Sequence, residues 1–278
     1  MDSFDYAALC GELEALYRSD GIMPRVIART VLGRAVFALE FGKRRPRTLL
    51  LAGVGGEGTT SRCLLRFCKA LLQHQREQVP FFGVDLSCAL RETGVTVIPC
   101  LNPDGLELAV HGLSAAGPLR RFLRPLLGSQ SLWTANARGV DLHHQFDAGF
   151  YDHRAPDIDA PCAGGFGGTT PQSEAESRAL TSLCRGEQFR HALLLQPGNN
   201  RLTVFAPSKN NSTANLCGKL LAQELHTAPQ SALLPDGAFP FWFSETMRRP
   251  AYIVQTGKES DPLPESMLFS CLLLSVLL

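Results

Sequence analysis

The side chains best suited to chemistry in this sequence are one arginine and two adjacent histidines in a single polar segment. Arg138, His143 and His144 lie within residues 133–146, which read WTANARGVDLHHQF. A guanidinium group matches the geometry of a carboxylate, and an imidazole is a common ligand of transition metals. We therefore expect this segment to bind an anion, a metal ion or both.

The two adjacent histidines leave open how many of them reach one site. Neighbouring residues of a strand point to opposite faces, so both imidazoles could bind one ion only if the backbone is irregular there. In the simpler interpretation, one histidine lies in the site and the other packs behind it. A further histidine, His111, follows an NPDG turn at residues 102–105 and is expected in a surface loop rather than as a ligand.

The elements that must position these residues alternate between strand and helix patterns. Helices are expected at residues 6–17, 59–72, 174–183, 214–225 and 267–278, and strands at residues 47–53, 95–100, 192–195 and 251–255, with two strand-like runs around Gly33 in residues 30–40. This alternation predicts an α/β fold with a mostly parallel mixed sheet and helices on both faces. Ligands of such sheets bind beyond the carboxyl ends of the strands. We expect one domain over residues 1–278.

Composition excludes several classes of protein. Hydrophobic residues make up 45% and charged residues 19% of the chain, a globular balance without a signature of disorder. The net charge of +1 favours neither nucleic acid nor an anionic membrane surface as a partner. Nothing in the sequence indicates an oligomeric state.

The cysteines and the sequences at the two ends of the chain indicate the cellular compartment. Nine cysteines, an odd number without a CxxC pair, are typical of free thiols in a reducing cytosol, so we expect a cytoplasmic protein. The beginning of the chain is acidic and lacks an apolar signal core. The apolar run 267–278 is shorter than the roughly 20 residues that span a membrane, and we expect it to pack on the core rather than act as a weak anchor.

Three segments, taken in order and spacing, carry a resemblance to a known family. They are residues 98–105 (IPCLNPDG), 133–146 and 167–176 (GGTTPQSEAE), supported by residues 30–42 and 237–264. Together they resemble the M14 zinc carboxypeptidases, and most of all the bacterial branch that cleaves γ-D-glutamyl-diaminopimelate bonds of peptidoglycan peptides. The resemblance implies a zinc-carboxypeptidase-like fold. It also implies a zinc held by an H-x-x-E turn and a distant His, a glutamate base, and Asn and Arg side chains that hold the substrate carboxylate.

Carried over residue by residue, the resemblance finds a degenerate zinc site. The H-x-x-E turn falls on residues 54–57, where Glu57 is retained as a remnant ligand but Val54 replaces the His. Gln196 stands at the position of the distant His, with an uncertainty of one residue in register. A catalytic zinc normally has three protein ligands, so a single carboxylate does not make a zinc site.

The catalytic and substrate positions have changed as well. Gln255 stands at the position of the general-base Glu, and an amide cannot accept a proton near neutral pH. His143 and His144 replace the Asn and Arg that hold the substrate carboxylate in many relatives, whereas Arg138 is retained. Glu57 without a metal needs another partner, and we expect it to cap the helix that begins near residue 59.

These substitutions favour a catalytically inactive homologue that binds peptide or peptidoglycan fragments through Arg138, His143 and His144, without zinc. The alternative is an active zinc peptidase with a rearranged site that uses Glu57 and His143 or His144. A third interpretation is an interaction module whose cleft is filled by side chains.

Overall fold

Eight strands form one mixed sheet at the centre of the computed structural model, which describes residues 3–42, 47–127, 133–151, 158–208, 211–232, 237–258 and 261–278. In chain order these strands are β1 (Arg25–Arg29), β2 (Ala35–Gly42), β3 (Arg47–Leu51), β4 (Gly94–Ile98), β5 (Phe189–Gln196), β6 (Leu202–Phe205), β7 (Pro229–Ser231) and β8 (Ala251–Gln255). A small separate pair consists of β9 (Gly257–Lys258) and β10 (Asp261–Pro262).

Helices connect and cover these strands. They are α1 (Tyr6–Asp20), α2 (Gly58–Glu77), α3 (Leu86–Glu92), α4 (Pro103–His111), α5 (Arg120–Leu127), α6 (Ala175–Gly186), α7 (Ser212–Glu224), α8 (Phe239–Met247) and α9 (Glu265–Leu277), with 3-10 turns η1 (Gly112–Leu119) and η2 (Leu142–His144).

The strand order in the sheet is β1-β2-β4-β3-β5-β8-β6-β7. The four central strands β4, β3, β5 and β8 run parallel to one another, while β2 and β6 flank them in the antiparallel direction. The prediction of a mostly parallel mixed sheet is confirmed. All four central strands therefore end at the same edge, which is where α/β sheets place their ligands.

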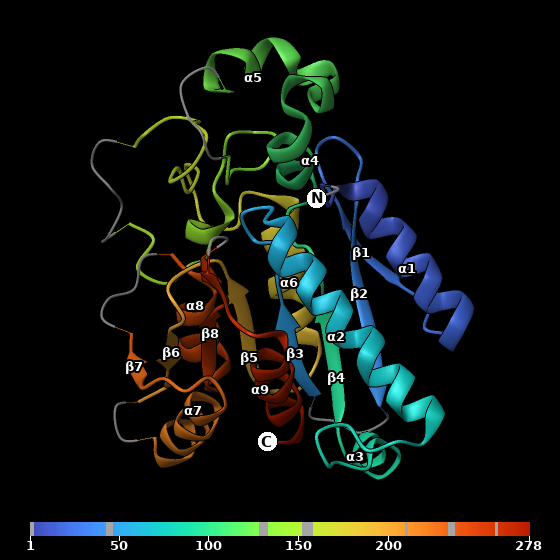
Figure 1. Cartoon of the computed structure of the whole chain (residues 1–278). Coiled ribbons are helices and arrows are strands. Elements are labelled where there is room, and N and C mark those ends of the chain that lie inside the picture. Colours follow the sequence, from blue (N-terminus) through green and yellow to red (C-terminus); the bar gives the residue numbers. More distant parts are fainter. Residues whose placement is uncertain are drawn as a thin grey trace.

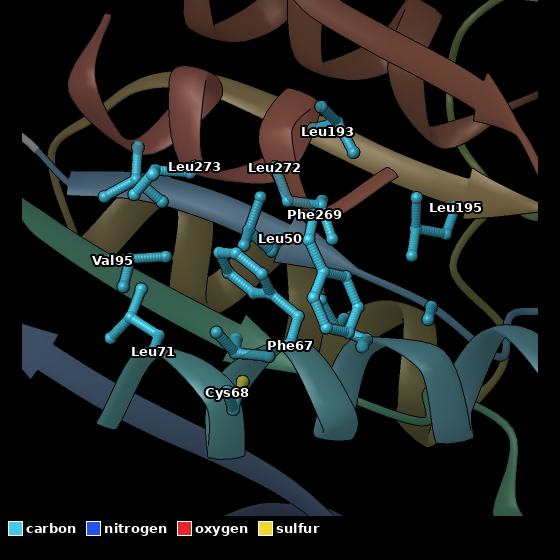
Figure 2. Close-up of a cluster of buried hydrophobic side chains, with 14 of the residues drawn as sticks. Leu50, Phe67, Cys68, Leu71, Val95, Leu193, Leu195, Phe269, Leu272 and Leu273 are labelled. Carbon is cyan, nitrogen blue, oxygen red and sulfur yellow. The ribbon is translucent and has the colours of Figure 1, made fainter. Parts of the chain in front are cut away.

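One face of the sheet carries the larger of the two main apolar layers. Helices α1, α2, α7 and α9 bury their apolar sides there, and α2 and α9 cross in front of the sheet in Figure 1. Figure 2 shows Phe67 of α2 and Phe269 of α9 between α2 and the strands of the sheet. Their ring centroids are 5.7 Å apart in an edge-to-face arrangement. The apolar spacing of α2, with Leu64, Phe67 and Leu71 buried, explains why this segment is a helix and which side it presents.

The opposite face is covered by α6 and α8. Leu180 and Cys184 of α6 and Trp242 of α8 join buried strand residues in a second cluster. The helices on both faces agree with the predicted architecture, and the strands between them read as continuous apolar runs because both of their faces are buried.

Two local predictions were wrong. The first strand of the 30–40 region lies earlier, at β1, because residues 30–33 form the turn of the hairpin, with Gly33 N donating to Thr30 O at 2.9 Å. The NPDG segment does not end in a loop but starts α4. Asn102 accepts a hydrogen bond from Gly105 N at 2.8 Å, and Pro103 takes the first helical position, where its missing N–H costs nothing.

The C-terminal apolar run forms α9, which packs on the core as expected. Leu272 and Cys271 are fully buried, and Ser275 O accepts the hydroxyl of Thr48 at 3.1 Å. Across the described part of the chain, we find no helix with the length and apolarity needed to span a membrane.

The buried cap of α4 yields a stability prediction. Asn102 is fully buried, and its amide also donates to Thr134 O at 3.4 Å, so Asn102→Ala removes the cap and leaves buried polar groups unpaired. We expect a loss of about 2 kcal/mol in the free energy of unfolding, measured by urea denaturation. The matched comparison is Asn211→Ala at the cap of α7, which accepts Ala214 N at 2.8 Å in a partly exposed place. Equal losses in the two variants would contradict the added cost of burial.

Candidate functional site

Four of the predicted site residues lie at or just beyond the carboxyl ends of the central strands, and His143 lies close to one of them, Glu57. We call the set Val54, Glu57, Arg138, His143, His144, Gln196 and Gln255 the strand-end site. Gln196 and Gln255 are the last residues of β5 and β8 and are paired in the register of these two strands. Val54 and Glu57 follow β3 directly, in the turn that leads into α2.

Glycines shape the turn that carries Val54 and Glu57. Gly56 has φ +76, and a Cβ atom there would lie 2.4 Å from Leu106 N. The turn can therefore press against the first turn of α4 only because Gly56 has no side chain. This contact fixes the position of Glu57, the N-cap residue of α2.

Glu57 occupies the N-cap position of α2, but its side chain makes no capping hydrogen bond, which corrects the expected role. Its Oε2 instead accepts Gly55 N at 3.1 Å, and its Oε1 lies 3.6 Å from His143 Nε2. The structure thus brings the remnant ligand and one of the two predicted histidines together. This pairing was not evident from the sequence because it depends on side-chain direction.

His143 and His144 belong to the 3-10 turn η2 rather than to a strand, so the backbone is irregular here, which is the condition under which both imidazoles could reach one ion. Asp141 caps this turn by accepting His143 N at 3.0 Å, and its Oδ1 also lies 2.9 Å from His143 Nδ1. A carboxylate on Nδ1 fixes the orientation of the ring and aims Nε2 at Glu57.

Asp141 is the best-satisfied carboxylate of the site. It also accepts Thr134 Oγ1 at 3.0 Å and Gly165 N at 2.8 Å. Burial by itself would raise the pKa of Asp141, but the charge and hydrogen bond of His143 outweigh it and hold that pKa well below the usual range. The ionised form of Asp141 is therefore built into the site.

The positions that would hold the missing zinc ligands and the base have other contacts. Val54 is 1% exposed and packs in the apolar cluster with Leu142. The side-chain oxygen of Gln255 accepts Asn199 N at 3.1 Å, and Gln196 O accepts Thr256 N at 2.9 Å. Hydrocarbon and amide groups thus occupy the positions that the resemblance assigns to two zinc ligands and the base.

Arg138 and His144 lie on either side of the Asp141 loop. Arg138 follows Asn136, whose side chain accepts Arg138 N at 2.9 Å, and its Nε lies 3.6 Å from the buried carboxylate of Glu174. The backbone of His144 rests against Gly167, where a Cβ atom would come within 2.5 Å of His144 O. Arg138 is 60% exposed, so its guanidinium is accessible to solvent despite this ion pair.

The strand-end site offers few donors for a metal. Within the described residues, Glu57 and His143 contribute one oxygen and one nitrogen close together, whereas a catalytic zinc normally takes three protein ligands. One group of three does occur elsewhere in the described ranges, formed by Asp5, Glu107 and His111. The prediction of His111 as a loop residue was wrong, since it ends α4, and the four-residue spacing from Glu107 was the signal that sequence reasoning overlooked.

Comparison with known proteins identifies the family to which this chain belongs. The family model of the zinc carboxypeptidases, Peptidase M14, matches residues 13–231. The chain belongs to the M14 zinc carboxypeptidase family. The predicted fold and the predicted family are thereby both confirmed.

Two bacterial proteins are similar to the chain over most of its length. The gamma-D-glutamyl-L-diamino acid endopeptidase 1 of Lysinibacillus sphaericus is 23% identical over 274 residues, which cover 95% of this chain and 68% of that protein. The uncharacterized protein YqgT of Bacillus subtilis (strain 168) is 26% identical over 249 residues, which cover 86% of this chain and 66% of YqgT. The chain thus spans about two thirds of the length of these relatives.

Solved structures of M14 proteins share the fold. Thrombin activatable fibrinolysis inhibitor superposes with a TM-score of 0.72 at 15% identity, covering 98% of this chain and 73% of that one. Murein-tripeptide amidase MpaA from Escherichia coli O157 superposes with a TM-score of 0.57 at 19% identity, covering 91% of each chain. At these identities the likeness establishes the architecture alone.

A buried acidic residue, Glu174, lies beside Arg138, and a second, Glu176, follows two residues later. Glu174 accepts Asn136 Nδ2 at 2.9 Å, and the neighbouring Glu176 is 1% exposed, with one carboxylate oxygen that has no hydrogen-bond partner. Burial raises the pKa of Glu176 to about 7, and the charges of Glu174 and Asp104 add to the effect. Glu176 therefore titrates in the neutral range.

The pH dependence of stability should report this carboxyl. Because the folded pKa lies above the unfolded one, the folded chain holds more protons, and stability falls as pH rises from about 5 to 7. Glu176→Gln should remove that fall and stabilise the chain at pH 8 by on the order of 1–3 kcal/mol, measured by urea unfolding at pH 5 and pH 8. The control is Glu14→Gln, at an exposed glutamate of α1. An unchanged pH profile in the Glu176 variant would contradict the assignment.

Proposed function

We propose that this chain is an M14 homologue that has lost zinc-dependent hydrolysis and uses the strand-end site to bind peptides or peptidoglycan-derived fragments. The observation that carries the proposal is Val54. It stands at a ligand position of the family, yet its side chain is hydrocarbon, 1% exposed and packed into the core. A metal ion bound where the family binds zinc would lack one imidazole ligand and would meet the apolar side chain of Val54 instead.

The fate of the retained glutamate supports the same proposal. Glu57 directs one oxygen to Gly55 N and the other toward His143 Nε2, so protein groups meet both oxygens. The imidazole of His143 is in turn fixed by Asp141. In the proposed state, this carboxylate–imidazole–carboxylate chain stabilises Glu57 without an ion.

Loss of the base supports the absence of hydrolysis independently of the metal. Gln255 is close in shape to a glutamate but cannot take a proton from water near neutral pH. Its oxygen is also held by Asn199 N, which keeps the amide in place. The site thus keeps the shape of a catalytic residue without its proton chemistry.

The proposed ligand class rests on charge and on the relatives. Arg138 presents an accessible guanidinium, and His143 follows in the same segment of the chain. A guanidinium and an imidazole both suit a carboxylate. The related endopeptidase is named for gamma-D-glutamyl-L-diamino acid bonds, and MpaA for a murein tripeptide. These names support a short acidic peptide as the ligand of this chain.

One observation favours the alternative of an active, rearranged zinc peptidase. His143 Nε2 and Glu57 Oε1 are 3.6 Å apart, close enough for both to contact one ion. Two donors are fewer than the three of catalytic zinc sites, so we place this alternative second.

Restoring the family ligands tests whether the metal site has been lost by side-chain replacement. The triple variant Val54→His, Gln196→His and Gln255→Glu should bind one more zinc per chain than the natural sequence, because the turn and strand ends that position these residues are intact. Elemental analysis of the purified proteins measures the difference. A correctly folded variant without the extra zinc would contradict the residue assignment, and a zinc lost from the natural chain on Glu57→Gln would favour the alternative.

Arg138 should be required for ligand binding. Arg138→Ala is expected to weaken binding of γ-D-glutamyl-diaminopimelate by about tenfold or more, because a charge-assisted hydrogen bond to a carboxylate is lost. Isothermal titration calorimetry measures the affinity, and Arg18→Ala, at an exposed arginine of α1, is the control. Equal affinity of the Arg138 variant and the natural chain would remove Arg138 from the proposed site.

A further inference from the structure

The side chains of Asp5, Glu107 and His111 converge where the chain begins, outside the strand-end site. Glu107 and His111 are four residues apart on α4 and so share one side of that helix. Asp5 is the N-cap of α1, and the beginning of α1 lies beside α4 in Figure 1. One ligand atom of each side chain lies within 4.8 Å of the other two.

Backbone groups hold both carboxylates in position. Asp5 Oδ1 accepts Ala8 N at 2.8 Å, and Glu107 Oε1 accepts Tyr6 N at 2.8 Å. The other oxygen of Asp5 faces His111 Nε2 at a distance of 3.0 Å. Outer hydrogen bonds of this kind orient ligating carboxylates. The second oxygen of Asp5 faces His111, whereas the second oxygen of Glu107 lies 3.4 Å from Arg34 Nη2.

The local charge suits a divalent cation. Arg34 is the basic partner, with Nη1 2.8 Å from Asp104 Oδ1 and Nη2 3.4 Å from Glu107 Oε2. One guanidinium thus pairs with two carboxylates, those of Asp104 and Glu107, which leaves one net negative charge among these three groups, and the carboxylate of Asp5 adds another. The side chain of His111 is 40% exposed and that of Asp5 is 23% exposed, so an ion can enter from solvent.

We propose that Asp5, Glu107 and His111 form a divalent metal site of their own, separate from the zinc position of the family. One imidazole and two carboxylates suit zinc or a similar transition ion better than calcium or magnesium, which prefer oxygen ligands alone. The ion replaces the direct contact between Asp5 and His111 and takes water at its open position. It joins the N-terminus of α1 to the end of α4.

This site changes how a metal analysis of the chain is interpreted. Zinc found in the purified protein can come from α1 and α4 rather than from the strand-end site. The location of the ion, and not its presence alone, decides whether hydrolysis has been lost. The inference goes beyond the proposed function and does not depend on it.

The test measures zinc binding to the chelator-treated full chain by isothermal titration calorimetry, with thermal unfolding recorded in zinc and in EDTA. The variants are His111→Asn and Asp5→Asn, the second of which keeps a side-chain oxygen for capping Ala8 N. His226→Asn, at an exposed histidine, is the matched control, and Glu57→Gln reports on the strand-end site.

We expect one zinc per chain in the natural sequence, with a higher Tm in zinc. His111→Asn and Asp5→Asn should each weaken zinc binding by about tenfold or more, while His226→Asn and Glu57→Gln leave it unchanged. Absence of saturable zinc binding overturns the proposal. Loss of zinc with Glu57→Gln but not with Asp5→Asn overturns it as well and moves the ion to the strand-end site. If His111→Asn does not fold, the Asp5 variant decides alone.

Discussion

The buried carboxylate of Asp141 is the interaction on which the arrangement of the strand-end site depends. It accepts hydrogen bonds from the backbone and ring of His143, from Thr134 and from Gly165, and so ties together three segments between residues 134 and 165. A buried charge is tolerable only when its acceptor positions are filled, and here they are. The direction of His143, and through it the environment of Glu57, follows from this one group.

The fold was predictable because its signals are local. The helix α2 follows from the helical spacing of its apolar residues, and the strands β3, β4 and β8 follow from short apolar runs. Both patterns reflect burial within each element. The start of α4 was missed because Asn102 and Pro103 were interpreted as turn residues, although both are also common at the first positions of a helix. Composition alone does not separate these two uses, since the same side-chain oxygen serves a turn or a cap.

For the candidate site, the sequence predicted which residues take part but not where their side chains point. A resemblance in sequence assigned roles to Val54, Glu57, Gln196 and Gln255, and the structure places these residues at the ends of the central strands. The direction of a side chain could not be predicted in this way. Glu57 turning from the helix toward His143 depends on an irregular backbone turn, and Asp5 meeting His111 depends on a contact across 106 residues. Neither leaves a periodic signal in the sequence.

The outer strand β1 has a consequence for how copies of this protein meet. Its pairing with β2 shifts register between Val26 and Ala28, and Arg25 and Arg29 stand at its two ends. A strand with a register shift and a long charged side chain at each end is a poor template for a further strand. Glu40 and Glu187 hold Arg25 in place at one of these ends. Continuous sheets of the kind that precede fibrils are therefore disfavoured along this side, in spite of the exposed Val26 that would otherwise invite them.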